Sequence, residues 1–174
     1  SFIKWSAMPI LSPHTLEFIS RHPDQTRRLG ARLGALLQGG TVIALEGTLG
    51  AGKTVLAQGI GRGWGATSRL ISPTFVLVRR HERPQDDDYL YHIDLYRLSS
   101  EMEIVDLGLS DHLGASDTVC IIEWANRAPG LLPASHLWVT LAWVDEFRRT
   151  LTFRASGAEH QALLETFRKE IIGR

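Results

Sequence analysis

The segment Gly47 to Thr54 reads GTLGAGKT and follows directly after the apolar run Val42 to Leu45 and Glu46. It matches the phosphate-loop pattern G-x-x-x-x-G-K-[ST] and lies where that pattern must lie, between a strand-length apolar run and the start of a helix. The glycines let the backbone curl with its N–H groups toward phosphate oxygens, and the helix N-terminus adds a positive dipole. We therefore predict that a nucleoside triphosphate is held by Gly47, Thr48, Leu49, Gly50, Ala51, Gly52 and Lys53, with Mg²⁺ on the Thr54 hydroxyl.

A carboxylate follows a second apolar run. Val119 to Ile122 are apolar and Glu123 comes next, which is the form expected for an acid at the carboxyl end of a buried strand beside the phosphate loop. Glu123 can hold Mg²⁺ directly, hold it through water, or orient the attacking water. The alternative is an acid that faces solvent at the end of its strand.

The segment Tyr91 to Leu98 carries a second candidate acid. Strand alternation places His92 and Asp94 on one face, away from Tyr91 and Ile93. Inside an apolar context such a pair is costly unless it is paired or functional, so we expect either a structural His–Asp hydrogen bond or a catalytic Asp94. The loop Ser72-Pro73-Thr74 is a weaker candidate, in which Thr74 would reach the γ-phosphate or its metal.

These residues narrow the class of enzyme without deciding it. The guanine-reading pattern Asn-Lys-x-Asp is absent, which disfavours a GTPase. The doublets Arg79-Arg80 and Arg148-Arg149 do not resemble the arginine-rich lid of a small-molecule kinase. ATP hydrolysis is the leading hypothesis, and a small-molecule kinase or a nucleotide-dependent binding module remain alternatives.

The surrounding elements predict one α/β domain over residues 14–174, preceded by an extension, residues 1–13, of unknown role. We expect a three-layer domain of the P-loop NTPase class, with a mainly parallel central sheet and some antiparallel strands. Strands are predicted at His14–Ser20, Thr41–Glu46, Phe75–Val78, Leu90–Leu95, Thr118–Glu123, Leu137–Val144 and Thr150–Arg154. Helices are predicted from an Asp24 N-cap to Gln38, from Lys53 to Arg62, from Ser99 to Gly108 and at Ala158–Ile171, with an irregular loop at Arg127–Pro133.

Composition adds limits. The 174 residues carry 19 Lys plus Arg against 19 Asp plus Glu, which argues against a DNA- or RNA-binding module that works by bulk positive charge. The single cysteine, Cys120, lies in an apolar run and is expected to be a buried, inert thiol. No run of 18 or more apolar residues occurs, so no membrane span is expected and the cytoplasm is the predicted location.

Four motifs in order resemble one family. GTLGAGKT, SPTF (Ser72 to Phe75), HIDLYRL (His92 to Leu98) and IEWANR (Ile122 to Arg127) are similar to the bacterial tRNA threonylcarbamoyladenosine biosynthesis ATPases of the TsaE family. The resemblance spans about residues 26 to 148. It implies a small cytoplasmic ATPase that uses ATP and Mg²⁺ and contacts no membrane or DNA.

The resemblance also implies partners and roles. The family works with a threonylcarbamoyl-transferase subunit and its dimerising partner, of the TsaD and TsaB types, on adenosine 37 of tRNAs that read ANN codons. By motif, Lys53, Asp94 and Glu123 would be catalytic, and Thr54, Asp94 and Glu123 would lie at the metal. Residues implied near the nucleotide are Thr26, Trp124 and Arg148, while Arg97 and Arg127 would stabilise phosphate charge or form ion pairs. Because no built-in arginine finger is evident, we expect slow intrinsic hydrolysis that a partner accelerates.

Overall fold

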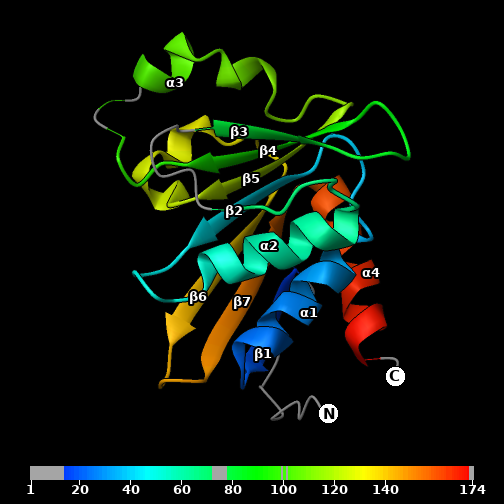
Figure 1. Ribbon diagram of the computed structural model, residues 1–174, viewed down its shortest axis with the longest axis vertical. Helices are drawn as coiled ribbons and strands as arrows, with labels where there is room; N and C mark the ends of the chain where they lie inside the picture. Colours follow the sequence, from blue (N-terminus) through cyan, green and yellow to red (C-terminus); the bar gives the residue numbers. More distant parts are fainter. Residues whose placement is uncertain (1–13, 72–77, 99, 101, 173–174) are drawn as a thin grey trace.

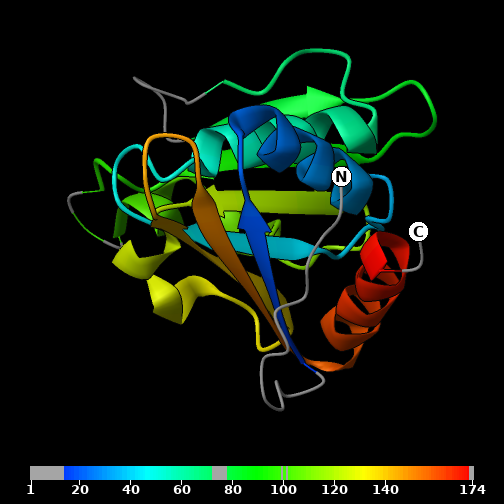
Figure 2. The same cartoon turned by 90° about the horizontal axis from the view of Figure 1, so that it is seen from below.

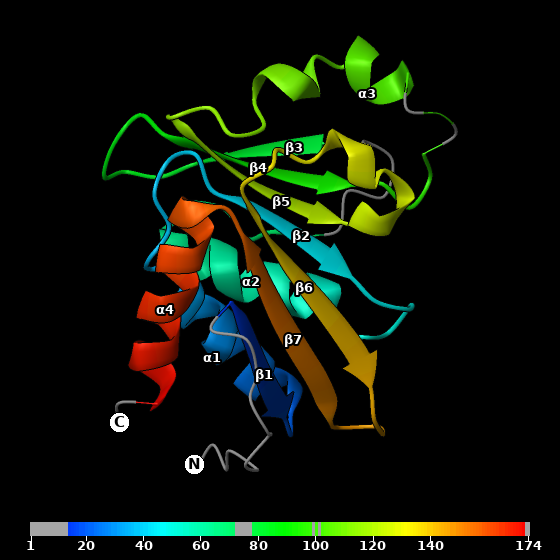
Figure 3. The same ribbon diagram turned by 180° about the vertical axis from the view of Figure 1, so that it is seen from behind.

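The described residues form one mixed sheet. The computed structural model describes residues 14–71, 78–98, 100 and 102–172 (Figure 1), so the predicted extension 1–13 and the loop Ser72–Thr74 lie outside them. The sheet has seven strands in the order β1-β7-β6-β2-β5-β4-β3 (Figure 3). Their bounds are β1 Thr15–Ser20, β2 Val42–Glu46, β3 Val78–Glu82, β4 Tyr89–Asp94, β5 Thr118–Glu123, β6 His136–Trp143 and β7 Arg149–Ser156.

The centre of the sheet is parallel and its margins are antiparallel. Strands β6, β2, β5 and β4 run parallel to one another, whereas β3 pairs antiparallel with β4, and β7 pairs antiparallel with β6 and β1. The predicted α/β class, with a mainly parallel centre and some antiparallel strands, is confirmed. Because the carboxyl ends of β2, β4 and β5 meet at one edge, the loops that follow these strands are neighbours.

The two faces of the sheet are covered differently. Helices α1 (Pro23–Gly34), α2 (Lys53–Trp64) and α4 (Ala158–Ile172) share one apolar core with inward residues such as Ile43 and Leu45. The opposite face, with Val42 and Ala44, is covered by three 3₁₀ turns: η1 (Leu109–Asp111), η2 (Ala125–Arg127) and η3 (Pro129–Leu131). The short helix α3 (Met102–Asp106) precedes η1, and its Met102 and Val105 are exposed. Figure 2 shows α1 and α2 on one side of the sheet and the yellow turns on the other.

Cys120 packs as predicted. It lies within β5, fully buried, and burial raises the pKa of its thiol to about 12. The thiol therefore stays protonated near neutral pH, and a protonated thiol is a poor nucleophile. None of the helices in the described part of the chain has the length and apolarity needed to span a bilayer.

Three local details differ from the prediction. The N-cap of α1 is His22, whose ring nitrogen accepts the N–H of Asp24, while Pro23 opens the helix. Proline is favoured at this position because it has no N–H to leave unpaired. The helix ends at Gly34 rather than Gln38. The loop predicted after β5 forms the 3₁₀ turns η2 and η3.

The strand beside β4 also differs from the prediction. Most of the predicted strand Phe75–Val78 lies outside the described residues, and β3 instead spans Val78–Glu82. Arg79, Arg80 and Glu82 are exposed on this outermost strand. An edge strand with charged outward residues has no apolar run that would indicate a strand. The sequence pattern therefore predicted no strand over residues 79–82.

Glycines bring α1 and α2 into backbone contact. A Cβ at Gly59 would overlap the carbonyl oxygen of Arg27, and a Cβ at Gly34 would overlap the carbonyl oxygen of Ile60. Gly63 lies in the same way against Ala31. The helix that begins at the phosphate loop is thus held to α1 without side chains between them.

We expect Gly59→Ala to destabilise the fold, although alanine normally favours a helix by about 1 kcal/mol. The added methyl group must displace the backbone of α1, and overpacking of this kind costs roughly 1–3 kcal/mol. Urea unfolding measures the loss. Gly130→Ala is the matched control, because nothing lies within 4 Å of a Cβ at that position. A Gly59→Ala protein as stable as the parent would contradict the packing.

Candidate functional site

The phosphate loop lies at the carboxyl edge of the parallel strands. It joins β2 to α2, and α2 begins at Lys53. Gly50 and Gly52 have φ of 79° and 99°, a left-handed conformation that glycine adopts without the steric cost other residues meet. Gly52 is also the N-cap of α2 and has no side chain to occupy the helix N-terminus.

Lys53 is folded across this loop. Its Nζ donates to the carbonyl oxygens of Gly47, at 2.5 Å, and Thr48, at 2.8 Å, and lies 4.1 Å from the ring centroid of Trp124. Burial lowers the pKa of this ammonium group, and the negative charges of Glu123 and Asp94 act in the opposite direction. The cation is therefore held at the centre of the site between backbone oxygens, carboxylates and an aromatic face.

Glu123 connects the loop helix to the sheet. The Thr54 hydroxyl donates to its Oε1 at 2.9 Å, and His92 Nε2 lies 2.5 Å from its Oε2. Glu123 is 2% exposed. The prediction of an acid at the end of a buried strand beside the phosphate loop agrees with this burial, and the alternative of an acid that faces solvent is wrong.

Asp94 lies beside Glu123 on the next strand. In the parallel pairing of β4 with β5, Asp94 is opposite Glu123 and His92 is opposite Ile121. Asp94 lines the cavity and its Oδ1 accepts the N–H of Tyr96 at 2.9 Å. His92 contacts Glu123 across the two strands, so the structure brings all three of these side chains to one place.

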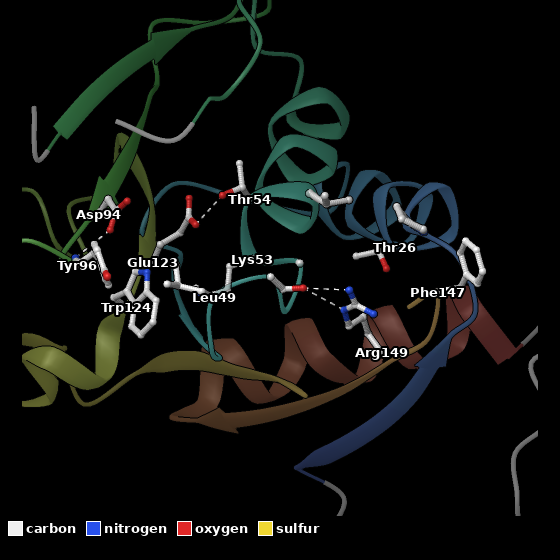
Figure 4. Close-up of a pocket in the computed structure, with 14 residues that line it drawn as sticks. Thr26, Leu49, Lys53, Thr54, Asp94, Tyr96, Glu123, Trp124, Phe147 and Arg149 are labelled. Carbon is white, nitrogen blue, oxygen red and sulfur yellow. Dashed lines mark hydrogen bonds between the residues drawn. The ribbon is translucent and has the colours of Figure 1, made fainter. Parts of the chain in front are cut away.

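A cavity of about 340 Å³ runs over the loop. Figure 4 shows Asp94, Tyr96, Glu123 and Trp124 at one end, Lys53 in the middle, and Thr26, Phe147 and Arg149 at the other. One end is thus acidic and aromatic, and the other combines an aromatic ring with hydroxyl and guanidinium groups. The remaining lining residues are Pro23, Leu49, Gly50, Gly52, Thr54 and Val55.

An arginine anchors the second end. The Arg149 guanidinium donates two hydrogen bonds to the carbonyl oxygen of Gly50, at 3.2 and 3.0 Å, and one to that of Asp145 at 2.6 Å. It thereby ties the turn between β6 and β7 to the phosphate loop. Nearby, Thr26 is buried, with its hydroxyl 2.6 Å from that of Ser20.

Trp124 has a constrained backbone. Among the described non-glycine residues, it is the one with positive φ, 59°, a conformation that is unfavourable for an aromatic residue. Its ring centroid lies 4.9 Å from that of Tyr96, and the Arg127 guanidinium lies 5.9 Å from the Trp124 centroid. This conformation places the indole between Lys53 and Tyr96.

The structure brings most of the predicted residues together. Lys53, Thr54, Asp94, Glu123, Trp124 and Thr26 line one cavity with Leu49, Gly50 and Gly52, whereas Gly47, Thr48 and Ala51 belong to the loop without lining it. Arg148 lies outside the lining, exposed and paired with Asp145 at 2.6 Å. Thr74 lies outside the described residues.

Four contributors were missed or misread. Arg149 is the neighbour of Arg148, which the sequence analysis placed near the nucleotide. The pair Arg148-Arg149 was the sequence feature that could have indicated Arg149. His92 was noted, but its partner was expected to be Asp94. Tyr96 and Phe147 line the cavity from loops and carry no pattern that would have singled them out.

The sequence model of the family described as "Threonylcarbamoyl adenosine biosynthesis protein TsaE" matches residues 20–151, most of the chain. The chain belongs to the TsaE family. The resemblance predicted from the four motifs is thereby confirmed.

Two relatives and one solved structure agree. The "tRNA threonylcarbamoyladenosine biosynthesis protein TsaE" of Bacillus subtilis is 34% identical over 152 residues, covering 86% of this chain and 92% of that protein. The protein of the same name from Nostoc is 40% identical over 129 residues, covering 72% of this chain and 77% of that protein. The crystal structure of Bacillus subtilis YdiB superposes with a TM-score of 0.76 at 26% identity, covering 94% of this chain and 99% of that one. This TsaE family member therefore matches these three proteins over 77–99% of their length.

We expect Arg149→Ala to weaken binding of a nucleoside triphosphate by roughly 10-fold or more, because charge-assisted hydrogen bonds contribute about 1.5–3 kcal/mol. Losing them frees the phosphate loop at Gly50. Titration with a fluorescent ATP analogue measures the affinity. Arg148→Ala is the matched control and should change affinity little, since that side chain pairs with an exposed Asp145. Equal losses in both variants would contradict the role given to Arg149.

Proposed function

We propose that this chain binds and hydrolyses ATP with Mg²⁺, and that hydrolysis supports formation of threonylcarbamoyladenosine at position 37 of tRNAs that read ANN codons. The observation that carries the proposal is the hydrogen bond between the Thr54 hydroxyl and Glu123 beneath the phosphate loop. Nucleoside triphosphatases of this class hold Mg²⁺ between a loop hydroxyl and a strand-end acid. The relatives carry the name of the tRNA modification.

The donor set fits Mg²⁺. A hydroxyl on Thr54 and carboxylates on Glu123 and Asp94 are oxygen ligands, which Mg²⁺ prefers. The described residues contain no group of three or more His, Cys, Asp or Glu side chains arranged to hold a metal. A site with few protein ligands is typical of Mg²⁺ bound together with substrate phosphates, which complete its coordination. When bound, Mg²⁺ would neutralise the charge of the β- and γ-phosphate oxygens.

The residues of the site have separate roles in the proposed hydrolysis. Lys53 leaves the Gly47 and Thr48 carbonyl oxygens for the β- and γ-phosphates and, with the loop N–H groups, stabilises charge that develops on them. Asp94 or Glu123 orients a water molecule toward the γ-phosphorus. The new bond joins the water oxygen to phosphorus, the bond to the β,γ-bridging oxygen breaks, and ADP leaves with that electron pair while a proton is released.

The cavity explains why turnover by the isolated chain should be slow. Among the described residues that line it, the cations are Lys53 and Arg149, and the Arg149 guanidinium is bonded to backbone carbonyls. An arginine supplied to the γ-phosphate speeds related hydrolases by about 10³–10⁵-fold. We infer that a partner completes the site.

The partners proposed are the threonylcarbamoyl-transferase subunit and its dimerising partner, of the TsaD and TsaB types. In this proposal the chain does not transfer the threonylcarbamoyl group, and tRNA is reached through those partners. Because tRNA is the substrate of the pathway, we expect the chain to act in the cytoplasm.

We expect ATP turnover by the isolated chain to rise at least about 10-fold when the partner pair is added. The reason is that the partners would supply a cationic group, such as an arginine, to the γ-phosphate. Phosphate release, followed by a coupled assay, measures it. Lys53→Ala should abolish turnover. The control is Lys169→Ala, which changes an exposed lysine on α4 and should leave turnover at the parental level. Fast turnover without partners would contradict the inference, and a phosphorylated metabolite in place of free phosphate would indicate a kinase.

The same pair of variants tests the pathway in cells. Lys53→Ala should deplete threonylcarbamoyladenosine from tRNA digests analysed by mass spectrometry, whereas Lys169→Ala should leave it at the parental level. Normal modification with Lys53→Ala as the sole copy would overturn the proposed function.

A further inference from the structure

His92 is a buried histidine directly behind the candidate metal site. It lies on β4, and the adjacent parallel strand β5 ends in Glu123. Its side chain is 0% exposed, and its Nε2 lies 2.5 Å from Glu123 Oε2. His92 does not line the cavity, so a nucleotide there would not contact it. The contact that His92 makes through Nε2 is with the Glu123 carboxylate.

The two oxygens of Glu123 have different partners. Oε1 accepts from Thr54 on the side of the phosphate loop, and Oε2 meets His92 on the side of the sheet. A carboxylate that is 2% exposed is strongly destabilised unless both oxygens are hydrogen-bonded. The two contacts therefore fix the plane of the carboxylate as well as its position.

The other nitrogen of His92 identifies its tautomer. Nδ1 is buried and has no hydrogen-bond partner in the described part of the chain. A bare Nδ1 lone pair is tolerated there more easily than an N–H donor, because orphaned buried N–H groups are the rarer defect. The hydrogen between the two side chains is therefore placed on Nε2, which donates to Glu123 Oε2.

We propose that His92 is a positioning residue that holds Glu123 as a fixed carboxylate for Mg²⁺, with Oε1 presented beside Thr54. This inference rests on the proposed function and assigns a role that the sequence motifs left open between the two acids. Glu123 is locked by hydrogen bonds on both oxygens and stays a metal-side charge. Asp94, half-buried in the cavity wall on the neighbouring strand, is the acid left to orient water. Partners behind metal ligands commonly alter metal affinity by about 10–100-fold.

The test compares His92→Gln with His92→Asn. The amide nitrogen of glutamine is four bonds from Cα, as is Nε2 of histidine, so His92→Gln keeps a donor within reach of Oε2. Asparagine is one bond shorter and loses it. His92→Phe removes the donor and keeps the ring, so it reports the loss in a packed interior even if His92→Asn folds poorly.

The readout is binding, with Mg²⁺ varied at fixed ATP analogue. We expect the Mg²⁺ concentration for half-maximal tight binding to rise about 10–100-fold in His92→Asn and His92→Phe, and by less than about 3-fold in His92→Gln. Affinity for the nucleotide without Mg²⁺ should match the parent in all three. In turnover assays kcat should fall with the Mg²⁺ affinity, while KM measured at saturating Mg²⁺ stays near the parental value.

The outcomes separate this inference from the proposed function. If the parent binds nucleotide tightly with no dependence on Mg²⁺, the proposed function fails and this inference fails with it. If the parent depends on Mg²⁺ but folded His92→Asn and His92→Phe show the parental Mg²⁺ dependence, the proposed function stands and His92 is only a packing residue. A loss in His92→Gln as large as in His92→Phe would also overturn the role of the donor.

Discussion

The hydrogen bond between the Thr54 hydroxyl and the Glu123 carboxylate joins the two halves of the site. Thr54 belongs to the first turn of α2, and Glu123 ends β5 at the centre of the sheet. The bond exists because β2 and β5 are parallel neighbours in which Leu45 is opposite Glu123, so the loop after β2 begins beside that carboxylate. Burial makes the contact obligatory, since an inward carboxylate without donors would destabilise the fold. The close packing of α2 on α1 at their glycines then holds α2 in the position where the Thr54 hydroxyl contacts Glu123.

The cavity extends from this bond in two directions that differ in chemistry. Toward β4 it is acidic and aromatic, with Asp94 beside Glu123 and the Trp124 indole against Lys53. Toward α1 it is bounded by Thr26, Phe147 and Arg149 (Figure 4). The loop Gly47 to Thr54 therefore separates an acidic, aromatic end from an end that combines hydroxyl, aromatic and guanidinium groups. Membership of the TsaE family links this arrangement to the tRNA modification for which the relatives are named.

Features that are local in sequence were predictable, and features that depend on strand pairing were not. The segment GTLGAGKT predicted the phosphate loop because its glycines, lysine and threonine hydroxyl lie within eight consecutive residues. Glu123 was predicted because it follows an apolar run typical of a buried strand. His92 was visible as a polar residue on an apolar strand, but its partner lies 31 residues away and is set by the β4–β5 register. Strand β3 was missed because its charged residues face solvent at the sheet edge. Arg149 was missed in favour of Arg148 because alternation along β7 does not say which of two adjacent arginines turns back to Gly50.

A double-mutant cycle on Thr54 and Glu123 tests the central claim most directly. Thr54→Ala, Glu123→Gln and the double variant would be compared for the free energy that Mg²⁺ adds to ATP binding. If both side chains serve one metal site, the double variant should lose little more than the worse single variant, with a coupling energy of about 0.5–3 kcal/mol. Additive losses, or an Mg²⁺ contribution unchanged in all three variants, would contradict the account.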